Sequence, residues 1–159
     1  MRKSQIGLKS IGVGANKVVK ASVVAGLLAI GVRFDIASVS LCLAACVMLV
    51  LYPPERLPTA AIGLMLVAGV VQQIIAMRTA FDQYIFASWA QLWRIESVNT
   101  DDEMDSFDQA LADIGLLRNV NRTRSLDERI TGAVRLLRHQ ALCVALQVAA
   151  WFYLMVCIR

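Results

Sequence analysis

The pattern of apolar and polar positions is dominated by two apolar runs, Ile36–Tyr52 and Thr59–Met77, which a short proline-rich stretch separates. The first run contains no charged residue and covers about 26 Å as a helix, close to the hydrocarbon thickness of a bilayer. The second run is slightly longer. Proline removes a backbone donor and restricts the residue before it, so residues 53–58 cannot continue a helix. The pattern predicts a transmembrane helical hairpin.

A third apolar run, Gln140–Ile158, predicts a C-terminal transmembrane helix. The shorter run Ala21–Val32 allows two topologies. As a re-entrant or interfacial segment it dips into the membrane without crossing, and the chain then crosses three times. If Lys17 and Lys20 extend to the headgroups, the same run can instead form a complete span, and the chain crosses four times.

The distribution of cationic residues favours three crossings. In that topology 14 of the 16 lysine and arginine residues share one side of the membrane, with Arg56 and Arg159 on the other. Four crossings would divide them seven to nine. Because lysine and arginine accumulate in cytoplasmic segments, we expect the polar section Arg78–Arg138 to lie in the cytoplasm.

The polar section predicts helices that begin with capping boxes. No proline or glycine interrupts Ala76–Val98, so the second span is expected to continue beyond the membrane. Thr100-Asp101-Asp102-Glu103 and Ser125-Leu126-Asp127-Glu128 match the capping-box pattern, and Gly115 is placed to end the helix between them. Apolar stripes predict a small layer of three helices, two of them continuous with spans. The stripes are Phe81, Ile85, Trp89 and Trp93; Met104, Phe107, Leu111 and Ile114; and Leu126, Ile130, Val134 and Leu137.

The composition agrees with this reading, since 58% of the residues are hydrophobic and 18% are charged. The predicted fold is an all-α integral membrane protein with a small helical polar domain. Four regions follow: a basic N-terminal arm (1–20), a membrane region with the hairpin (21–77), a helical polar domain (78–138) and a C-terminal transmembrane helix (139–159).

Small residues mark the helix faces that are expected to pack closely. Ser38, Cys42 and Cys46 recur every four positions in the first span, and Gly63 and Gly69 lie in the second. Small residues let helix backbones approach where lipid provides no hydrophobic drive. These positions predict contacts with another helix, either in the same chain or in a neighbouring copy. The cysteines are expected to behave as small apolar residues.

Three glutamines, Gln72, Gln73 and Gln147, lie in the predicted spans. An amide in hydrocarbon needs a partner, so a hydrogen bond between glutamines of the second and last spans is expected. A conducting path lined by these residues is the alternative.

The net charge of +4 comes chiefly from the N-terminal tail, where no acidic residue is present. Anionic lipid headgroups are the expected counterpart. The candidate headgroup contacts are Lys17, Lys20, Arg135, Arg138 and His139.

The sequence contains a single histidine and lacks zinc-ligand spacing, a phosphate loop and a nucleophile elbow. It therefore predicts no catalytic residue, no cofactor and no metal site, and it identifies neither a small-molecule substrate nor a nucleic-acid partner. The expected function is a non-enzymatic membrane subunit that assembles with itself or with other proteins. Secretion and conjugation machines of the bacterial envelope, in the inner membrane, offer the architectural analogy. The alternative is an oligomeric pore-forming or membrane-permeabilising effector.

Overall fold

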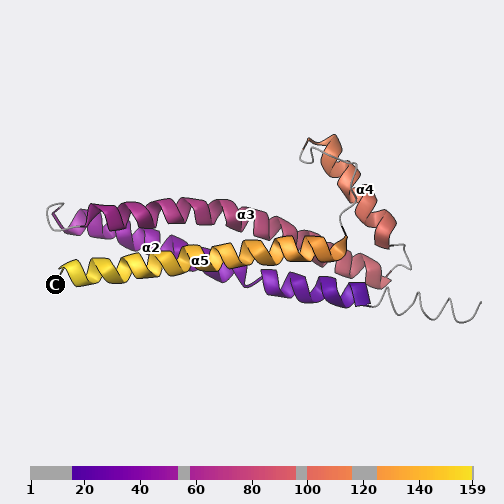
Figure 1. The fold of residues 1–159 in the computed structure, drawn as a ribbon, viewed down its shortest axis with the longest axis horizontal. Helices are drawn as coiled ribbons and strands as arrows, with labels where there is room; N and C mark the ends of the chain where they lie inside the picture. Colours follow the sequence, from indigo (N-terminus) through magenta and orange to yellow (C-terminus); the bar gives the residue numbers. More distant parts are fainter. Residues whose placement is uncertain (1–15, 54–57, 96–99, 116–124, 159) are drawn as a thin grey trace, which may run out of the picture. The chain divides into compact units, whose positions relative to one another are not determined.

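The computed structural model describes residues 16–53, 58–95, 100–115 and 125–158, and within these ranges the chain forms helices and no strands. Residues 16–28 are helical and lead through a turn at 29–30 into α2 (Gly31–Leu51). The chain continues with α3 (Thr59–Ile95), α4 (Thr100–Asp113) and α5 (Leu126–Ile158) (Figure 1). The all-α prediction is confirmed.

Three helical stretches are long and apolar enough to cross a membrane: Asn16–Leu51, Thr59–Arg94 and Leu126–Ile158. They contain 36, 36 and 33 residues. A 36-residue helix is about 54 Å long, whereas the hydrocarbon core is about 30 Å thick, so each helix extends well beyond it. Ala21–Val32 falls within the first of these stretches, which the turn at 29–30 interrupts. The turn has hydrogen bonds between residues three apart, from Ile30 N to Leu27 O and from Arg33 N to Ile30 O. Whether this run crosses the membrane or only dips into it stays a prediction.

The chain divides into two compact units. Unit 2 comprises residues 26–83 and 133–159, and unit 1 comprises residues 1–25 and 84–132. Both α3 and α5 contribute one part of their length to each unit.

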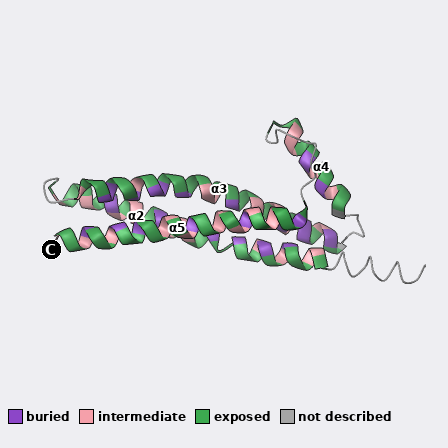
Figure 2. Cartoon of the chain, viewed as in Figure 1, coloured by how far each residue is buried: buried purple, intermediate pink, exposed green. Residues whose placement is uncertain are grey.

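Unit 2 is a bundle of α2, α3 and α5 whose buried positions recur every seven residues. A Cβ at Gly31 would lie 2.7 Å from Gln140 Oε1 and 3.2 Å from Thr79 Cγ2, so these three residues share a layer. Because the chain direction reverses between α2 and α3, one heptad further along gives Ser38, Gln72 and Gln147, and the next gives Ala45, Met65 and Leu154. The eight non-glycine residues of these three layers each have an exposed fraction of at most 2%. Seven-residue spacing is typical of left-handed helix packing, and Figure 2 shows buried residues recurring along each helix.

The last of these layers belongs to an apolar core. Ala45, Ile62, Met65, Ala150 and Leu154 form one cluster, against which partly buried side chains such as Trp151 and Tyr52 pack. The end of the bundle that contains Ala45, Met65 and Leu154 is therefore stabilised by hydrophobic packing.

Unit 1 is built around the aromatic part of α3. Trp89 lies edge to face against Phe86 and against Phe107 of α4, and it stacks on Trp93. The guanidinium of Arg129 lies over the Trp89 ring and forms an ion pair with Asp108, with both charged side chains largely buried.

The predicted stripes are partly wrong at their ends. Phe81 and Ile114 are exposed, with exposed fractions of 49% and 68%. Phe86, which the stripe on α3 omits, is buried instead. An α-helix has 3.6 residues per turn, so the α3 stripe, which takes every fourth residue, drifts off the buried face over several turns. Ile114 lies in the turn that follows the last residue of α4, Asp113.

Two of the local signals for helix ends are confirmed, the capping box at Ser125 and the glycine stop at Gly115. Ser125 Oγ accepts from the N–H of Glu128, and the Glu128 carboxylate accepts from the N–H of Ser125, which is a reciprocal capping box. Gly115 ends the α4 segment with φ of 76°, a conformation that favours glycine. The second span continues without a break to Ile95, as expected.

Candidate functional site

The interior of unit 2 is polar over half of its length. Five polar side chains fill the first two layers of the bundle, and none of them has an exposed fraction above 2%: Ser38, Gln72, Thr79, Gln140 and Gln147. Hydrocarbon surrounds a transmembrane bundle, so each polar side chain inside it needs a partner within the protein or from a ligand.

Gln147 is the best satisfied of these residues. Its Nε2 donates to the backbone carbonyl of Met65 at 3.1 Å and to Cys42 Sγ at 3.3 Å. The Cys42 thiol in turn lies 3.7 Å from the same carbonyl oxygen. Gly69 faces this contact, and the absence of a side chain there lets α2, α3 and α5 approach one another. Gln147 thus ties α5 to the hairpin.

The predicted bond between glutamines is wrong. In the part of the chain that the structure describes, neither amide atom of Gln72 has a hydrogen-bond partner, and Gln73 donates to Asp35 rather than to Gln147. Gln147 instead finds a backbone carbonyl of α3, since the small side chains around Gly69 bring that carbonyl within reach. The three glutamines therefore have three different environments.

Several buried polar atoms lack a partner within the described residues. They are both amide atoms of Gln72, both amide atoms of Gln140, Ser38 Oγ and Gln147 Oε1. A buried group without a hydrogen bond costs about 1 to 3 kcal/mol. Stability alone does not account for these residues, because apolar side chains of the same size would avoid that cost.

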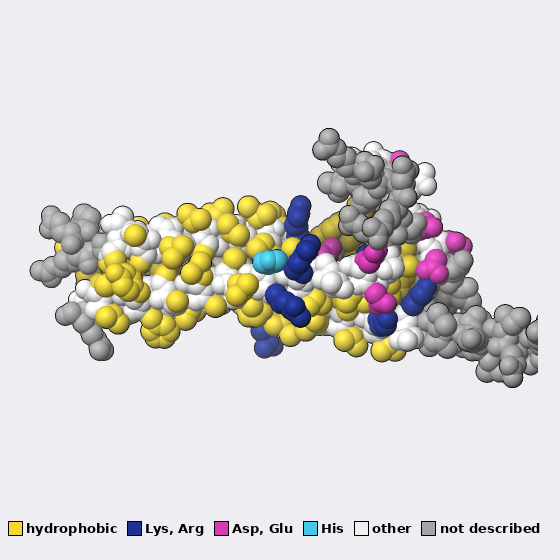
Figure 3. All heavy atoms as spheres, in the orientation of Figure 1, with side chains coloured by type: hydrophobic (Ala, Val, Ile, Leu, Met, Phe, Trp, Pro, Cys, Tyr) yellow, Lys and Arg dark blue, Asp and Glu magenta, His cyan; other side chains and the backbone are white. Residues whose placement is uncertain are grey.

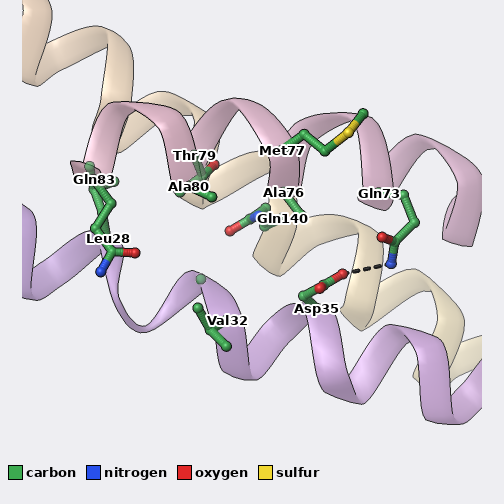
Figure 4. A pocket seen from close by; sticks show the side chains of 11 residues that line it. Leu28, Val32, Asp35, Gln73, Ala76, Met77, Thr79, Ala80, Gln83 and Gln140 are labelled. Atoms are coloured by element: carbon green, nitrogen blue, oxygen red, sulfur yellow. Dashed lines mark hydrogen bonds between the residues drawn. The ribbon is translucent and has the colours of Figure 1, made fainter. Parts of the chain in front are cut away.

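A cavity of about 180 Å³ opens beside the first polar layer. The turns of α2 and α3 at this level line it together with Gln140 of α5. Figure 4 shows Gln140 between the two helices, with Asp35 and Gln73 at one end of the cavity and Gln83 at the other. Gln73 Nε2 donates to Asp35 Oδ1 at 2.6 Å. The cavity thus combines one carboxylate, several amides and apolar walls.

A cationic collar surrounds the bundle at the level of the cavity. We define it as Arg33, Arg78, Arg138 and His139, all exposed. Each lies within two residues of the Gly31–Thr79–Gln140 layer, which is about 3 Å along a helix. Figure 3 shows a band of Lys and Arg side chains with the histidine beside it, next to a hydrophobic surface. From the collar to Ile158, α5 is about 28 Å long, so the collar fits the headgroup level of a bilayer.

The predicted headgroup residues fall into two groups. Arg138 and His139 belong to the collar, and Arg135 is exposed one turn earlier on α5. Lys17 and Lys20, by contrast, form ion pairs with Asp101 and Asp127 in unit 1, each at 2.7 Å. Contact of any of these residues with lipid stays a prediction.

Of the small residues predicted to pack closely, some face the interior of the bundle and others are exposed. Ser38, Cys42 and Gly69 face the interior of the bundle, as described above. Cys46 and Gly63 are exposed, and a Cβ at Gly63 would meet nothing within 4 Å. Within the bundle, Ala45 occupies the buried position next to Cys46.

Sequence reasoning missed Gly31, Asp35, Thr79 and Gln140 as parts of one site. A signal was present, because Thr79 follows Gln72 by seven residues and Gln147 follows Gln140 by seven. Polar residues seven apart in two apolar helices indicate that both face one interior. Within the described residues, no three or more His, Cys, Asp and Glu side chains come together in a way that could hold a metal ion.

Comparison of the chain with protein-family models, with curated proteins and with solved structures gives no match to any of the three.

Proposed function

We propose that the protein is a non-enzymatic subunit of the bacterial inner membrane that assembles with itself or with other membrane proteins, for example in an envelope secretion or conjugation machine. One observation carries the proposal: the helix of residues 16–28 has a second apolar face that no other part of the described chain covers. Val19, Val23 and Leu27 follow one another at intervals of four residues, with exposed fractions of 59%, 64% and 37%.

This face lies beyond the part of the helix that lipid accounts for. Along the chain, the collar residue Arg33 separates residues 16–28 from the apolar run of α2, and we propose that these residues lie outside the hydrocarbon. The opposite face of the same helix is used within the chain, since Ala21, Val24 and Leu28 have exposed fractions of 6% or less. A contiguous exposed apolar face outside the hydrocarbon is typical of a protein contact.

The environment of the glutamines offers less support for the alternative, a pore formed between copies. Gln72 and Gln147 are fully buried inside the bundle of a single chain, so they do not face a neighbouring copy. The apolar layer of Ala45, Met65 and Leu154 follows directly in the bundle interior. We therefore propose assembly and not conduction.

The test is the native mass of the full chain extracted into lipid nanodiscs. We expect a particle that contains more protein than one 17.4 kDa chain. The variant Val19→Ala/Val23→Ala should reduce it to the single chain, because it removes most of the exposed apolar area of residues 16–28.

The matched control is Val67→Ala/Val70→Ala on α3. These valines have exposed fractions of 63% and 62%, close to those of Val19 and Val23, but they lie within the apolar span. The control should keep the larger particle. A parent chain that is monomeric and co-purifies with no other protein would exclude the proposal, and equal effects of the two double variants would exclude the role of this face.

A further inference from the structure

We propose that the cavity at the collar end of unit 2 binds the ammonium group of a small organic cation. The inference rests on the charge of its lining, on a buried amide without a partner and on its size.

The charge inside the cavity is negative. Asp35 is the one charged residue among the eleven that line it, and no lysine or arginine is among them. A carboxylate accepts about four hydrogen bonds, and the contact with Gln73 Nε2 at 2.6 Å uses one of these positions. The remaining positions are suited to a ligand with a positive charge and N–H donors.

Gln140 provides the second anchor. Its side chain is fully buried and lines the cavity, and among the described residues neither its Oε1 nor its Nε2 has a hydrogen-bond partner. The side chain fits because position 31 is glycine: a Cβ there would lie 2.7 Å from Gln140 Oε1. Figure 4 shows the amide between α2 and α3, inside the cavity. A ligand N–H donor would satisfy the amide oxygen, which otherwise stays unpaired at a cost.

The size of the cavity limits the ligand to a few heavy atoms. About 180 Å³ corresponds to roughly six water molecules at their liquid volume. Leu28, Val32, Ala76 and Ala80 provide apolar walls that suit a short alkyl chain. A primary alkylammonium ion meets all three conditions, whereas a quaternary ammonium ion has no N–H to donate.

Two kinds of molecule carry such a primary ammonium group, a free alkylamine and the ethanolamine headgroup of a phospholipid. The lining residues Val32 and Met77 are the sequence neighbours of Arg33 and Arg78 in the collar. A lipid phosphate at the collar could therefore accompany an ammonium group in the cavity.

The test measures binding of n-butylammonium to the full chain in phosphatidylcholine nanodiscs by ligand-detected NMR, with empty nanodiscs subtracted. We expect saturable binding of n-butylammonium and at least tenfold weaker binding of n-butanol and of tetramethylammonium. Asp35→Asn, which keeps the shape of the side chain, should weaken n-butylammonium binding at least tenfold. Asp105→Asn, an exposed acid on α4, is the matched control and should leave it unchanged.

A second pair of variants leaves the charge intact. Ala76→Leu extends into the cavity and should abolish binding, whereas Ala60→Leu, exposed on the same helix and outside the lining, should not. This pair decides the question if Asp35→Asn fails to fold, as judged by circular dichroism. Equal binding of n-butanol and n-butylammonium, or parent-like binding by Ala76→Leu, would overturn the proposal.

The source is distinguished by adding phosphatidylethanolamine to the nanodiscs. Competition of phosphatidylethanolamine with n-butylammonium for the parent protein would support the lipid headgroup as ligand. Undiminished n-butylammonium binding would support a free amine. Failure of both n-butylammonium and phosphatidylethanolamine to bind would refute the ammonium site.

Discussion

Replacing Gly69 with alanine is expected to destabilise the transmembrane bundle, because side chains of α2 and α5 lie directly against this glycine of α3. An added Cβ would lie well inside 3.0 Å of Cys42 Sγ, a separation that real Cβ atoms essentially never show, and 3.2 Å from Gln147 Nε2. Neither neighbour can move freely, since Gln147 Nε2 donates to both Cys42 Sγ and the Met65 carbonyl. Relief therefore requires a shift of α2 or the loss of these bonds.

The size of the effect follows from two opposing terms. Overpacking of a tight core costs about 1 to 3 kcal/mol. Alanine is favoured over glycine inside a helix by about 0.5 to 1 kcal/mol. We expect a net loss of about 1 to 2 kcal/mol in the free energy of unfolding of Gly69→Ala. Gly63→Ala has only the second term, because nothing lies within 4 Å of the added atom, and should gain up to about 1 kcal/mol.

The assay is unfolding in mixed micelles titrated with sodium dodecyl sulfate and followed by tryptophan fluorescence and far-UV circular dichroism. A double-mutant cycle with Cys42→Ala isolates the contact, since without Sγ the nearest remaining cysteine atom is Cβ at 3.9 Å. Cys42→Ala should therefore recover most of the loss in the Gly69→Ala background. If Gly69→Ala is as stable as Gly63→Ala, or if Cys42→Ala gives no recovery, the described packing is wrong.

Three further predictions use the same unfolding assay. Gln72→Leu should stabilise the protein by about 1 kcal/mol, because it removes two buried amide atoms that have no partner among the described residues. Gln147→Leu should destabilise the protein by a similar amount, because the hydrogen bonds of Gln147 are lost. Effects of the same sign would contradict these two environments. Ser125→Ala should lower the free energy of unfolding by about 1 kcal/mol, because it removes the Oγ that accepts from the N–H of Glu128 in the capping box. An unchanged unfolding midpoint would show that the cap contributes nothing. Arg129→Leu should cost about 3 kcal/mol by leaving Asp108 buried without its partner, and Arg129→Leu/Asp108→Leu should recover most of this; no recovery would place the cost elsewhere.

Features that depend on neighbouring residues could be predicted from the sequence. The two longest apolar runs, the proline-rich connector and the Ser125 capping box each act over a few residues, so their physical consequences are local. The continuity of α3 followed from the absence of proline and glycine in 76–98, and that of α5 from the presence of no breaker other than Gly132.

The interior of the bundle could not be predicted in the same way, because it depends on how three helices are oriented. The four-residue spacing of Ser38, Cys42 and Cys46 suggested one face, but a left-handed bundle repeats every seven residues and places Ala45 inside instead of Cys46. Gln72 and Gln73 are adjacent in sequence, and nothing local distinguishes the buried amide from the exposed one.

Long-range ion pairs were equally invisible in the sequence. Lys17 and Lys20 lie in a basic segment that resembles a lipid-binding arm. Their ion-pair partners, Asp101 and Asp127, lie more than 80 residues away in the sequence, so no local pattern indicates the pairing. Asp35 marked the end of an apolar run, and its role as a lining residue became apparent only when Gln73 and Gln140 were placed beside it.

The central claim, that the chain crosses the membrane three times with both polar regions on one side, is tested most directly by cysteine labelling. Single cysteines at Asn16, Pro53 and Gln109, each exposed in the structure, are placed in a background without the four native cysteines. They are treated in sealed, right-side-out vesicles with a membrane-impermeant thiol reagent. We predict labelling at Pro53 alone, with Asn16 and Gln109 reacting only after the vesicles are permeabilised. Labelling of Gln109 with protection of both Asn16 and Pro53 would contradict the account and establish four crossings.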